Sequence, residues 1–432
     1  MTQLSKAEQG RTTPQITSVA RAEHVAVALI RSRVAGGQIV IPWNPVHAPH
    51  PLGIGKGLRV KVNANIGTSM EHCSLKEEVT KAKVAVDAGA HAVMDLSTGG
   101  DLDQIRRALL KVVHVPFGTV PIYQTGIEAI EKHGSIVDMT ADDMFRVFEK
   151  QAKQGVDFAV VHVGVTKESV ARLRKQKRHI PMVSRGGSFH MAWILHHQEE
   201  NPLYKEFGYL LELAKQHDVT LSLGDGMRSG ALADSNDRAK FQELLIIGEL
   251  VEQAREAGVQ TMVEGPGHMP LNDIEPNILV MKSVTKDAPY FVLGPLVTDI
   301  APGYDHFVGG IGGALAGFVG ADFLCYVTPA EHLCLPDKDD VREGVIATRI
   351  AAHAADLARG LDREVDAVFS DAREALNWEK MFRLCIDARK AKQYRTKRPS
   401  LEDTSACSMC GKLCAIEMVK RYLEIKDTKT SR

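Results

Sequence analysis

The chain lacks the features of membrane, exported and polyanion-binding proteins. No apolar run approaches the roughly 20 residues that a membrane helix needs, and the opening sequence MTQLSKAEQGRTTPQ has no apolar export segment. Lys and Arg total 53 against 54 Asp and Glu, which leaves no basic excess for nucleic acid. Cysteine is scarce, and its odd number of 7 argues against a disulfide framework. We therefore expect a cytoplasmic globular protein that binds neither membranes nor nucleic acid.

What the chain does contain is a repeated alternation between about residues 57 and 360. Each repeat has a short β-branched run, a turn rich in Gly, Ser or Asn, and an amphipathic stretch, which is typical of βα units around a parallel sheet. An open doubly wound sheet fits the same pattern, but so many strands favour closure into an α/β fold, a (β/α)8 TIM-like barrel. Nine runs compete for its eight places: VKVNANIG, HAVMDLST, VPFGTVPIY, DFAVVHVGV, PMVSRGG, VTLSLGDG, QTMVEGPG, YFVLGPL and DFLCYVTP.

Composition changes divide the chain into four parts. Residues 1–56 form an N-terminal segment to which the pattern assigns no structure, and residues 57–360 form the catalytic barrel. Residues 361–398 read as a helical extension, in which DREVDAVFSDAREALN and WEKMFRLCIDARKAKQYR are each predicted to be one helix. Residues 399–432 are a tail that carries CSMCGKLC after the polar stretch TKRPSLEDTSA, a linker with some reach.

Polar residues follow the ends of the predicted strands. In a barrel the carboxyl ends of the strands carry the active site. One such residue alone is more often a cap or a satisfied buried group, but this many favours a functional site. The residues are Asn63, Asn65, Met94, Asp95, Tyr123, His162, Ser184, Arg185, Asp225, Arg228, Glu264 and His268.

Two glycine-containing loops suggest how a phosphorylated ligand is held. In SRGGS at 184–188, backbone N–H groups and an Arg suit a phosphate dianion, although a plain glycine turn explains the segment equally well. In GDGMRSG, Asp225 and Arg228 can hold a ribose hydroxyl and an anionic group.

Two histidines lie in loops with proline. His268 in EGPGHMP and His332 in TPAEHLCLP can share one divalent ion with Glu264 and water. Histidines this far apart in sequence are no motif, so separate structural or acid–base roles explain them too.

The most specific feature is the group Cys407, Cys410 and Cys414. Three thiolates can bind three irons of a 4Fe–4S cluster and leave the fourth iron open to S-adenosylmethionine (SAM), which one-electron reduction cleaves to a carbon radical. The alternative is a structural zinc ion with a fourth ligand from elsewhere.

Ordered motifs over about residues 38 to 420 resemble the phosphomethylpyrimidine synthase family of thiamin biosynthesis. That family converts 5-aminoimidazole ribotide by radical SAM chemistry at a 4Fe–4S cluster, as a radical SAM lyase. Its relatives include 5-hydroxybenzimidazole synthase, which takes the same ribotide to a cobamide ligand. The motifs are VNANIGTS, AVMDLSTGGD, GTVPIYQ, GVDF, VSRGGS, LSLGDGMR, VEGPGHMP, VLGPLVTDIAPGYDH, CYVTPAEHL, RIAAHAADLARG and CSMCG.

The resemblance implies roles for particular residues. It makes Glu264 and Asp225 catalytic, His268 and His332 ligands of a divalent ion, zinc by expectation, and the three cysteines the cluster ligands. It implies a homodimer, whose cysteine tail closes over one barrel or the other, and a one-electron donor such as flavodoxin or ferredoxin. The implied substrate contacts are Asn65, Met94, Tyr123, His162, Ser184, Arg185, Gly186, Asp225, Gly226, Met227, Arg228, Glu264 and Phe291.

Three positions depart from the pyrimidine-synthase pattern. Ser229 replaces a proline, Phe291 a tyrosine, and Trp43 a small residue. A lost hydroxyl in a substrate pocket leaves a polar partner unpaired, so the departures favour a changed pocket and 5-hydroxybenzimidazole as product. The short Cys410–Cys414 spacing is that of the short family members, in which both products occur.

Three other functions remain open. Phosphomethylpyrimidine synthase activity is the alternative within the family. A metal-dependent barrel lyase with a zinc tail, or a non-catalytic metabolite-binding protein, would belong to other classes.

Overall fold

The structure, a computed structural model, describes residues 1–400 and 405–430. It divides into two compact units, Met1–Arg359 and Gly360–Arg432.

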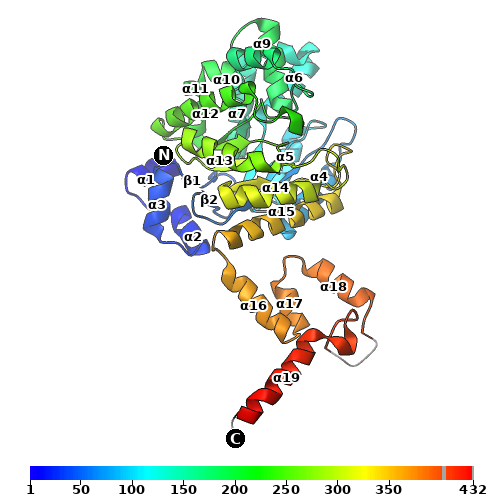
Figure 1. The fold of residues 1–432 in the computed structure, drawn as a ribbon. Helices are drawn as coiled ribbons and strands as arrows, with labels where there is room; N and C mark the ends of the chain where they lie inside the picture. Colours follow the sequence, from blue (N-terminus) through cyan, green and yellow to red (C-terminus); the bar gives the residue numbers. More distant parts are fainter. Residues whose placement is uncertain (401–404, 431–432) are drawn as a thin grey trace. The chain divides into compact units, whose positions relative to one another are not determined.

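Eight parallel strands close into a barrel in the first unit, with β10 pairing back onto β3. Figure 1 shows the helices that surround these strands. The strands are short, almost fully buried apolar runs, as expected where helices cover a parallel sheet. The predicted (β/α)8 barrel is therefore confirmed. The strands are β3 (Lys61–Ile66), β4 (Ala92–Asp95), β5 (Phe117–Thr119), β6 (Phe158–Val161), β7 (Thr220–Leu223), β8 (Thr261–Gly265), β9 (Tyr290–Leu293) and β10 (Phe323–Cys325).

The ninth candidate strand, PMVSRGG, is wrong. Strand β6 pairs directly with β7, and residues 181–187 lie in the connection between them. Pro181 has no N–H for a sheet ladder, and Ser184 is the N-cap of helix α9 (Arg185–His197), where its side chain accepts from the N–H of Gly187 at 3.1 Å. The segment is thus a loop and a helix start beside the barrel mouth.

Helices follow the strands as the alternation predicts. Helix α4 (Leu75–Asp87) starts at the N-cap Ser74, and α12 (Arg238–Glu256) ends before Gly258, whose φ of 77° is left-handed. None of the described helices is long and apolar enough to span a membrane. The others of this layer are α5 (Leu102–Leu110), α6 (Pro121–His133), α7 (Ala141–Gln154), α8 (Lys167–Lys175), α10 (Pro202–Lys205), α11 (Phe207–His217), α13 (Leu271–Val284), α14 (Asp305–Val319) and α15 (Lys338–Ala358), with 3-10 turns η1 (Ile136–Asp138) and η2 (Leu232–Asp234).

The N-terminal segment closes the amino-terminal end of the barrel. The backbone N–H of Ile41 donates to Oε1 of Gln260 at 2.7 Å, and that of Asn44 donates to Oδ1 of Asp157 at 2.7 Å. Gln260 and Asp157 directly precede β8 and β6, so the segment covers the end opposite to the predicted site. Its elements are α1 (Gln3–Glu8), α2 (Pro14–Ala22), α3 (Val27–Ala35) and the antiparallel pair β1 (Ile39–Val40) and β2 (Ile54–Gly55).

The second unit is helical. The segment predicted as one helix, WEKMFRLCIDARKAKQYR, forms two, because Cys385 is extended and Asp387 caps a new helix by accepting from the N–H of Lys390 at 3.0 Å. Part of the predicted linker, residues 401–404, lies outside the described residues. The elements are α16 (Arg363–Glu374), α17 (Trp378–Leu384), α18 (Ala388–Lys397), η3 (Gly411–Leu413) and α19 (Ala415–Thr430).

Candidate active site

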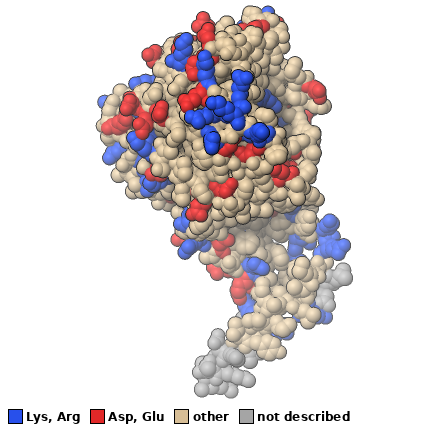
Figure 2. Space-filling view, turned by 45° about the horizontal axis from the view of Figure 1, so that its top comes forward, with Lys and Arg blue, Asp and Glu red and all other residues tan. Residues whose placement is uncertain are grey.

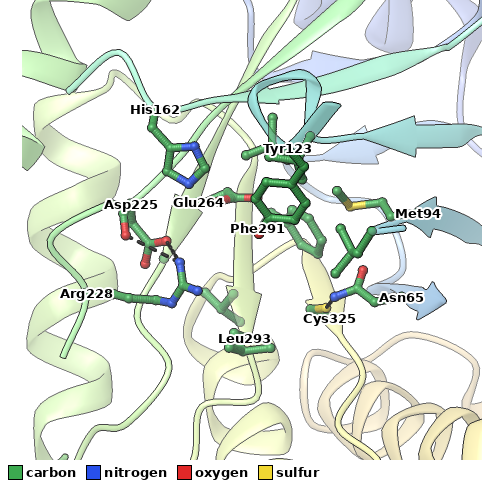
Figure 3. Close-up of a pocket in the computed structure, with 15 residues that line it drawn as sticks. Asn65, Met94, Tyr123, His162, Asp225, Arg228, Glu264, Phe291, Leu293 and Cys325 are labelled. Carbon is green, nitrogen blue, oxygen red and sulfur yellow. Dashed lines mark hydrogen bonds and ion pairs between the residues drawn. The ribbon is translucent and has the colours of Figure 1, made fainter. Parts of the chain in front are cut away.

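A pocket of about 90 Å³ lies at the carboxyl ends of the barrel strands (Figure 3). Of the thirteen residues for which the resemblance implies substrate contact, eight line it: Asn65, Met94, Tyr123, His162, Asp225, Arg228, Glu264 and Phe291. They come from strands and loops spread over about 230 residues of sequence, and the closure of the barrel brings them together. The other five, Ser184, Arg185, Gly186, Gly226 and Met227, lie beside these lining residues or in the same loops.

Two carboxyl groups and one guanidinium dominate the electrostatics of the pocket. Nη1 of Arg228 lies 3.1 Å from Oδ1 of Asp225, three residues earlier in the loop after β7. Burial raises the pKa of Asp225 in spite of Arg228. Burial and the charge of Asp225 raise the pKa of Glu264. Carboxyl groups with raised pKa in a pocket can hold or release protons near neutral pH, as general acids and bases do.

The buried Glu243, which the sequence did not reveal as a site residue, holds the loop from Asp225 to Arg228 by a hydrogen bond. Oε2 of Glu243, on α12, accepts from the backbone N–H of Met227 at 2.8 Å. Its Oε1 is buried without a hydrogen-bond partner, and burial and Asp225 raise the pKa of Glu243 to about 8. A protonated Glu243 therefore holds Met227 between Asp225 and Arg228.

His162 is held by the loop that begins α9. Its Nε2 lies 3.1 Å from Oγ of Ser184. Gly186 packs so closely against the ring of His162 that a Cβ at this position would lie 2.2 Å from Cε1. Burial lowers the pKa of His162 well below its ordinary value, so the imidazole is neutral and can donate or accept one hydrogen bond.

Tyr123 links the pocket to the amino terminus of α9. The guanidinium of Arg185, the first residue of that helix, lies 5.1 Å from the centre of the Tyr123 ring, within the range of a cation–π contact. Arg185 is exposed, while the Tyr123 ring lines the pocket. An anionic group extending from the pocket would meet this guanidinium and the positive end of the helix.

Cys325 is a pocket residue that the sequence analysis missed. It ends β10, and Nδ2 of Asn65 donates to its sulfur at 3.0 Å. Burial raises the pKa of Cys325 to about 12, so it is a neutral thiol. A cysteine inside the apolar run DFLCYVTP resembles any core residue, and only the position at the strand end marks it.

The three sequence departures prove to lie in different places. Phe291 lines the pocket and stacks on Phe323 with ring centres 4.2 Å apart. Ser229 is fully buried beside the pocket, where its hydroxyl donates to the carbonyl of His268 at 2.6 Å. Trp43 packs in the N-terminal segment and donates to the carbonyl of Pro49 at 3.0 Å, at the opposite end of the barrel. The expectation that Trp43 marks a changed pocket is therefore wrong.

A second cavity of about 400 Å³ shares Arg228 and Leu293 with the first and contains both predicted histidine ligands. The rings of His268 and His332 lie 5.2 Å apart. Asp299 lies 2.8 Å from Nδ1 of His268, and Asp305 lies 3.3 Å from Nδ1 of His332. Within residues 1–400 and 405–430, no three His, Cys, Asp or Glu side chains are grouped closely enough to hold a metal ion.

Two of the predicted cluster cysteines, Cys407 and Cys410, lie in one turn of the second unit, and the buried Cys414 directly follows η3. The backbone N–H groups of Cys410 and Gly411 donate to the carbonyl of Cys407 at 3.2 and 2.9 Å. Cys410 is exposed, and backbone N–H groups that point at its sulfur lower the pKa of Cys407. A lowered pKa favours the thiolate, which is the form of cysteine that binds metals.

Comparison with known proteins agrees with the motifs. The model of the radical SAM ThiC family matches residues 2–421. The phosphomethylpyrimidine synthase of Moorella thermoacetica is 57% identical over 426 residues, which cover 98% of each chain. That of Methanocaldococcus jannaschii is 56% identical over 422 residues, covering 97% of this chain and 99% of its own. Among solved structures, a dihydropteroate synthase from Coxiella burnetii in complex with pteroic acid is 12% identical, with a TM-score of 0.41, and covers 71% of this chain and 96% of its own.

Proposed function

This chain belongs to the radical SAM ThiC family, and we propose from this premise that it is a phosphomethylpyrimidine synthase. It would convert 5-aminoimidazole ribotide into the phosphate of hydroxymethylpyrimidine, the reaction that the resemblance implies. Relatives that carry this name are 53–57% identical over nearly their whole length. Membership in a radical SAM family implies a 4Fe–4S cluster and SAM. It argues against a metal-dependent lyase with a zinc tail and against a non-catalytic protein.

The observation that carries the proposal is the convergence of eight implied contact residues on one pocket. Arg185 and the amino terminus of α9 are placed to bind the ribotide phosphate, since both offer donors at the pocket edge. Asn65 and neutral His162 offer hydrogen bonds to the imidazole and ribose. Asp225 and Glu264 are placed to move protons during the rearrangement, because their raised pKa lets either one carry a proton.

The cofactors are assigned to two further sets of side chains. Cys407, Cys410 and Cys414 would hold the cluster, which when bound supplies the electron that cleaves SAM. His268 and His332 would hold a divalent ion, zinc by expectation. A carboxylate at Nδ1 of each histidine would leave Nε2 free as the metal-binding atom, the arrangement common around protein-bound zinc. The adjoining 400 Å³ cavity gives a second reactant room beside the ribotide.

The preference for 5-hydroxybenzimidazole synthase finds no support in the relatives, whose names favour the alternative. One observation keeps it as a second candidate. Phe291 lines the pocket where the resemblance implies a tyrosine, so one hydroxyl is missing from the substrate site. Ser229 and Trp43 add nothing to that case, because neither lines the pocket. The homodimer, the electron donor and the cytoplasmic location remain predictions.

The test is identification of the product. Anaerobic enzyme with a reconstituted cluster would be incubated with aminoimidazole ribotide, SAM and dithionite, and the products analysed by mass spectrometry. We expect hydroxymethylpyrimidine phosphate from the natural enzyme and from Phe291→Tyr. Formation of 5-hydroxybenzimidazole would overturn the proposal and assign the second function. Absence of SAM cleavage would refute both.

A further inference from the structure

Helix α18 concentrates positive charge on the second unit. Its sequence ARKAKQYRTK contains five Lys and Arg and no acidic residue, and Arg398 follows it. Arg389, Lys392, Lys397 and Arg398 are exposed. Figure 2 shows Lys and Arg side chains gathered on one side of this unit. The formal net charge of the whole chain is only −1, so the basic surface is a local feature.

This helix is tied directly to the cysteine turn. Nη2 of Arg395 donates to the carbonyl of Ala406 at 3.3 Å, and the hydroxyl of Ser408 donates to the carbonyl of Arg398 at 2.7 Å. Arg395 also lies 4.2 Å over the ring of Trp378, whose indole N–H donates to the carbonyl of Ser405 at 2.7 Å. The contacts flank Cys407 on both sides in sequence, so the basic helix is joined to the turn that carries Cys407 and the exposed Cys410.

We propose that α18 and the cysteine turn together are the docking surface for an acidic one-electron carrier protein. The inference rests on the proposed function, which requires that electrons reach a cluster held by Cys407, Cys410 and Cys414. The carrier would lose one electron and the cluster would gain it. The cluster, when bound, would pass the electron to the SAM sulfonium, whose carbon–sulfur bond would break to give methionine and a carbon radical.

Charge and position both point to this partner. Electron tunnelling weakens steeply with distance, so a carrier must dock close to the cysteines, and Cys410 is exposed. A basic surface attracts an acidic partner and speeds encounter by about 10- to 1000-fold, an effect that salt suppresses. A nucleic acid or an anionic membrane would also be attracted by α18, but neither has a reason to bind beside the proposed ligands of a redox cluster.

The experiment compares two charge-reversed variants of the full-length holoenzyme. The test variant is Arg389→Glu, Lys392→Glu, Lys397→Glu on α18. The matched control is Arg172→Glu, Arg174→Glu, Lys175→Glu on α8, an exposed basic segment of the other unit. Reduced flavodoxin serves as the probe, and its oxidation is followed by absorbance together with the affinity of oxidised flavodoxin for each enzyme.

At low ionic strength the α18 variant should be reduced at least about tenfold more slowly than the natural enzyme, and should bind flavodoxin correspondingly more weakly. The difference should shrink in high salt, and the α8 variant should behave like the natural enzyme. SAM cleavage with dithionite should be unchanged in all three, since this small reductant needs no docking surface.

Several outcomes would overturn the proposal. These are equal reduction rates for the natural and α18-variant enzymes, equal slowing of the α8 variant, or loss of dithionite-driven cleavage in the α18 variant. The same holds if the α18 variant loses affinity for duplex DNA or phosphatidylserine vesicles while flavodoxin reduces it normally. Failure of the natural enzyme to cleave SAM with dithionite would instead refute the proposed function.

Discussion

Replacement of Glu243 by glutamine should make the free energy of unfolding of the barrel less dependent on pH between pH 5 and 8. Glu243 is almost fully buried; its Oε2 accepts from the N–H of Met227, and its Oε1 has no hydrogen-bond partner. Glutamine keeps the carbonyl oxygen that accepts this hydrogen bond but cannot ionise. The loop from Asp225 to Arg228 should therefore keep its position in Glu243→Gln, while the cost of burying a charge disappears.

The size and sign of the effect follow from the pKa. Burial and Asp225 raise the pKa of Glu243 from an ordinary 4.5 to about 8. The unfolded chain thus releases this proton near pH 4.5 and the folded chain only near pH 8, so the free energy of unfolding falls as pH rises between these values. At 1.36 kcal/mol for each pKa unit the fall is at most about 5 kcal/mol, and relaxation of the site should reduce it to about 2–3 kcal/mol.

The measurement is urea unfolding at pH 5, 6, 7 and 8, followed by tryptophan fluorescence. Trp378→Phe in every protein leaves Trp43 and Trp193, which both report on the barrel unit. Glu243→Gln should lose about 2–3 kcal/mol less than the parent between pH 5 and 8. Glu249→Gln, at an exposed position of the same helix, should match the parent. A parallel pH dependence in Glu243→Gln and the parent would refute the reasoning.

Two further substitutions test the site itself. Gly186→Ala places a Cβ 2.2 Å from Cε1 of His162, and an overpacking cost of about 1–3 kcal/mol should lower kcat/KM by about 5- to 150-fold. The control Gly208→Ala, whose Cβ has no atom within 4 Å, should leave kcat/KM unchanged. Equal effects of the two substitutions would contradict the packing argument. Cys410→Ala should abolish SAM cleavage with dithionite and lower the amount of iron bound per chain. The control Cys73→Ala should retain both the cleavage and the iron. SAM cleavage by Cys410→Ala would show that this cysteine is not a ligand of the proposed cluster.

The barrel could be predicted from the sequence because its strands are local patterns. Most are short apolar runs followed by a polar turn, and several helices, such as α12 before Gly258, end where a residue takes left-handed backbone geometry. PMVSRGG was mistaken for a strand because an apolar run before Ser and Gly resembles a strand end. The deciding hydrogen bond, from Gly187 to the side chain of Ser184, marks a helix start instead.

The site was predictable where a polar residue ends a strand, as with Asn65 and Glu264. It was not predictable where the role depends on distant partners. Glu243 sits among apolar residues of α12 and gains its importance from Met227 above it. Cys325 resembles a core residue in the sequence, and only the hydrogen bond that its sulfur accepts from Nδ2 of Asn65 shows that it lies in the site. The sequence does not show that Trp43 lies away from the pocket, because a residue that precedes the first strand can cover either end of a barrel.

The closure of the barrel by residues that precede it bears on the order in which the chain folds during synthesis. Ile41 and the side chain of Gln260 that it pairs with lie 219 positions apart. At about 5–20 residues per second, the ribosome needs roughly 10 to 45 s to make the chain between them. During that interval the segment can assemble its own small core around Ile16, Ile30 and Ile39. It can also attach to Asp157, which is made well before Gln260. The attachment beside β8 therefore forms last, and a nascent chain stalled before β8 carries an N-terminal segment that lacks its hydrogen bonds to Gln260.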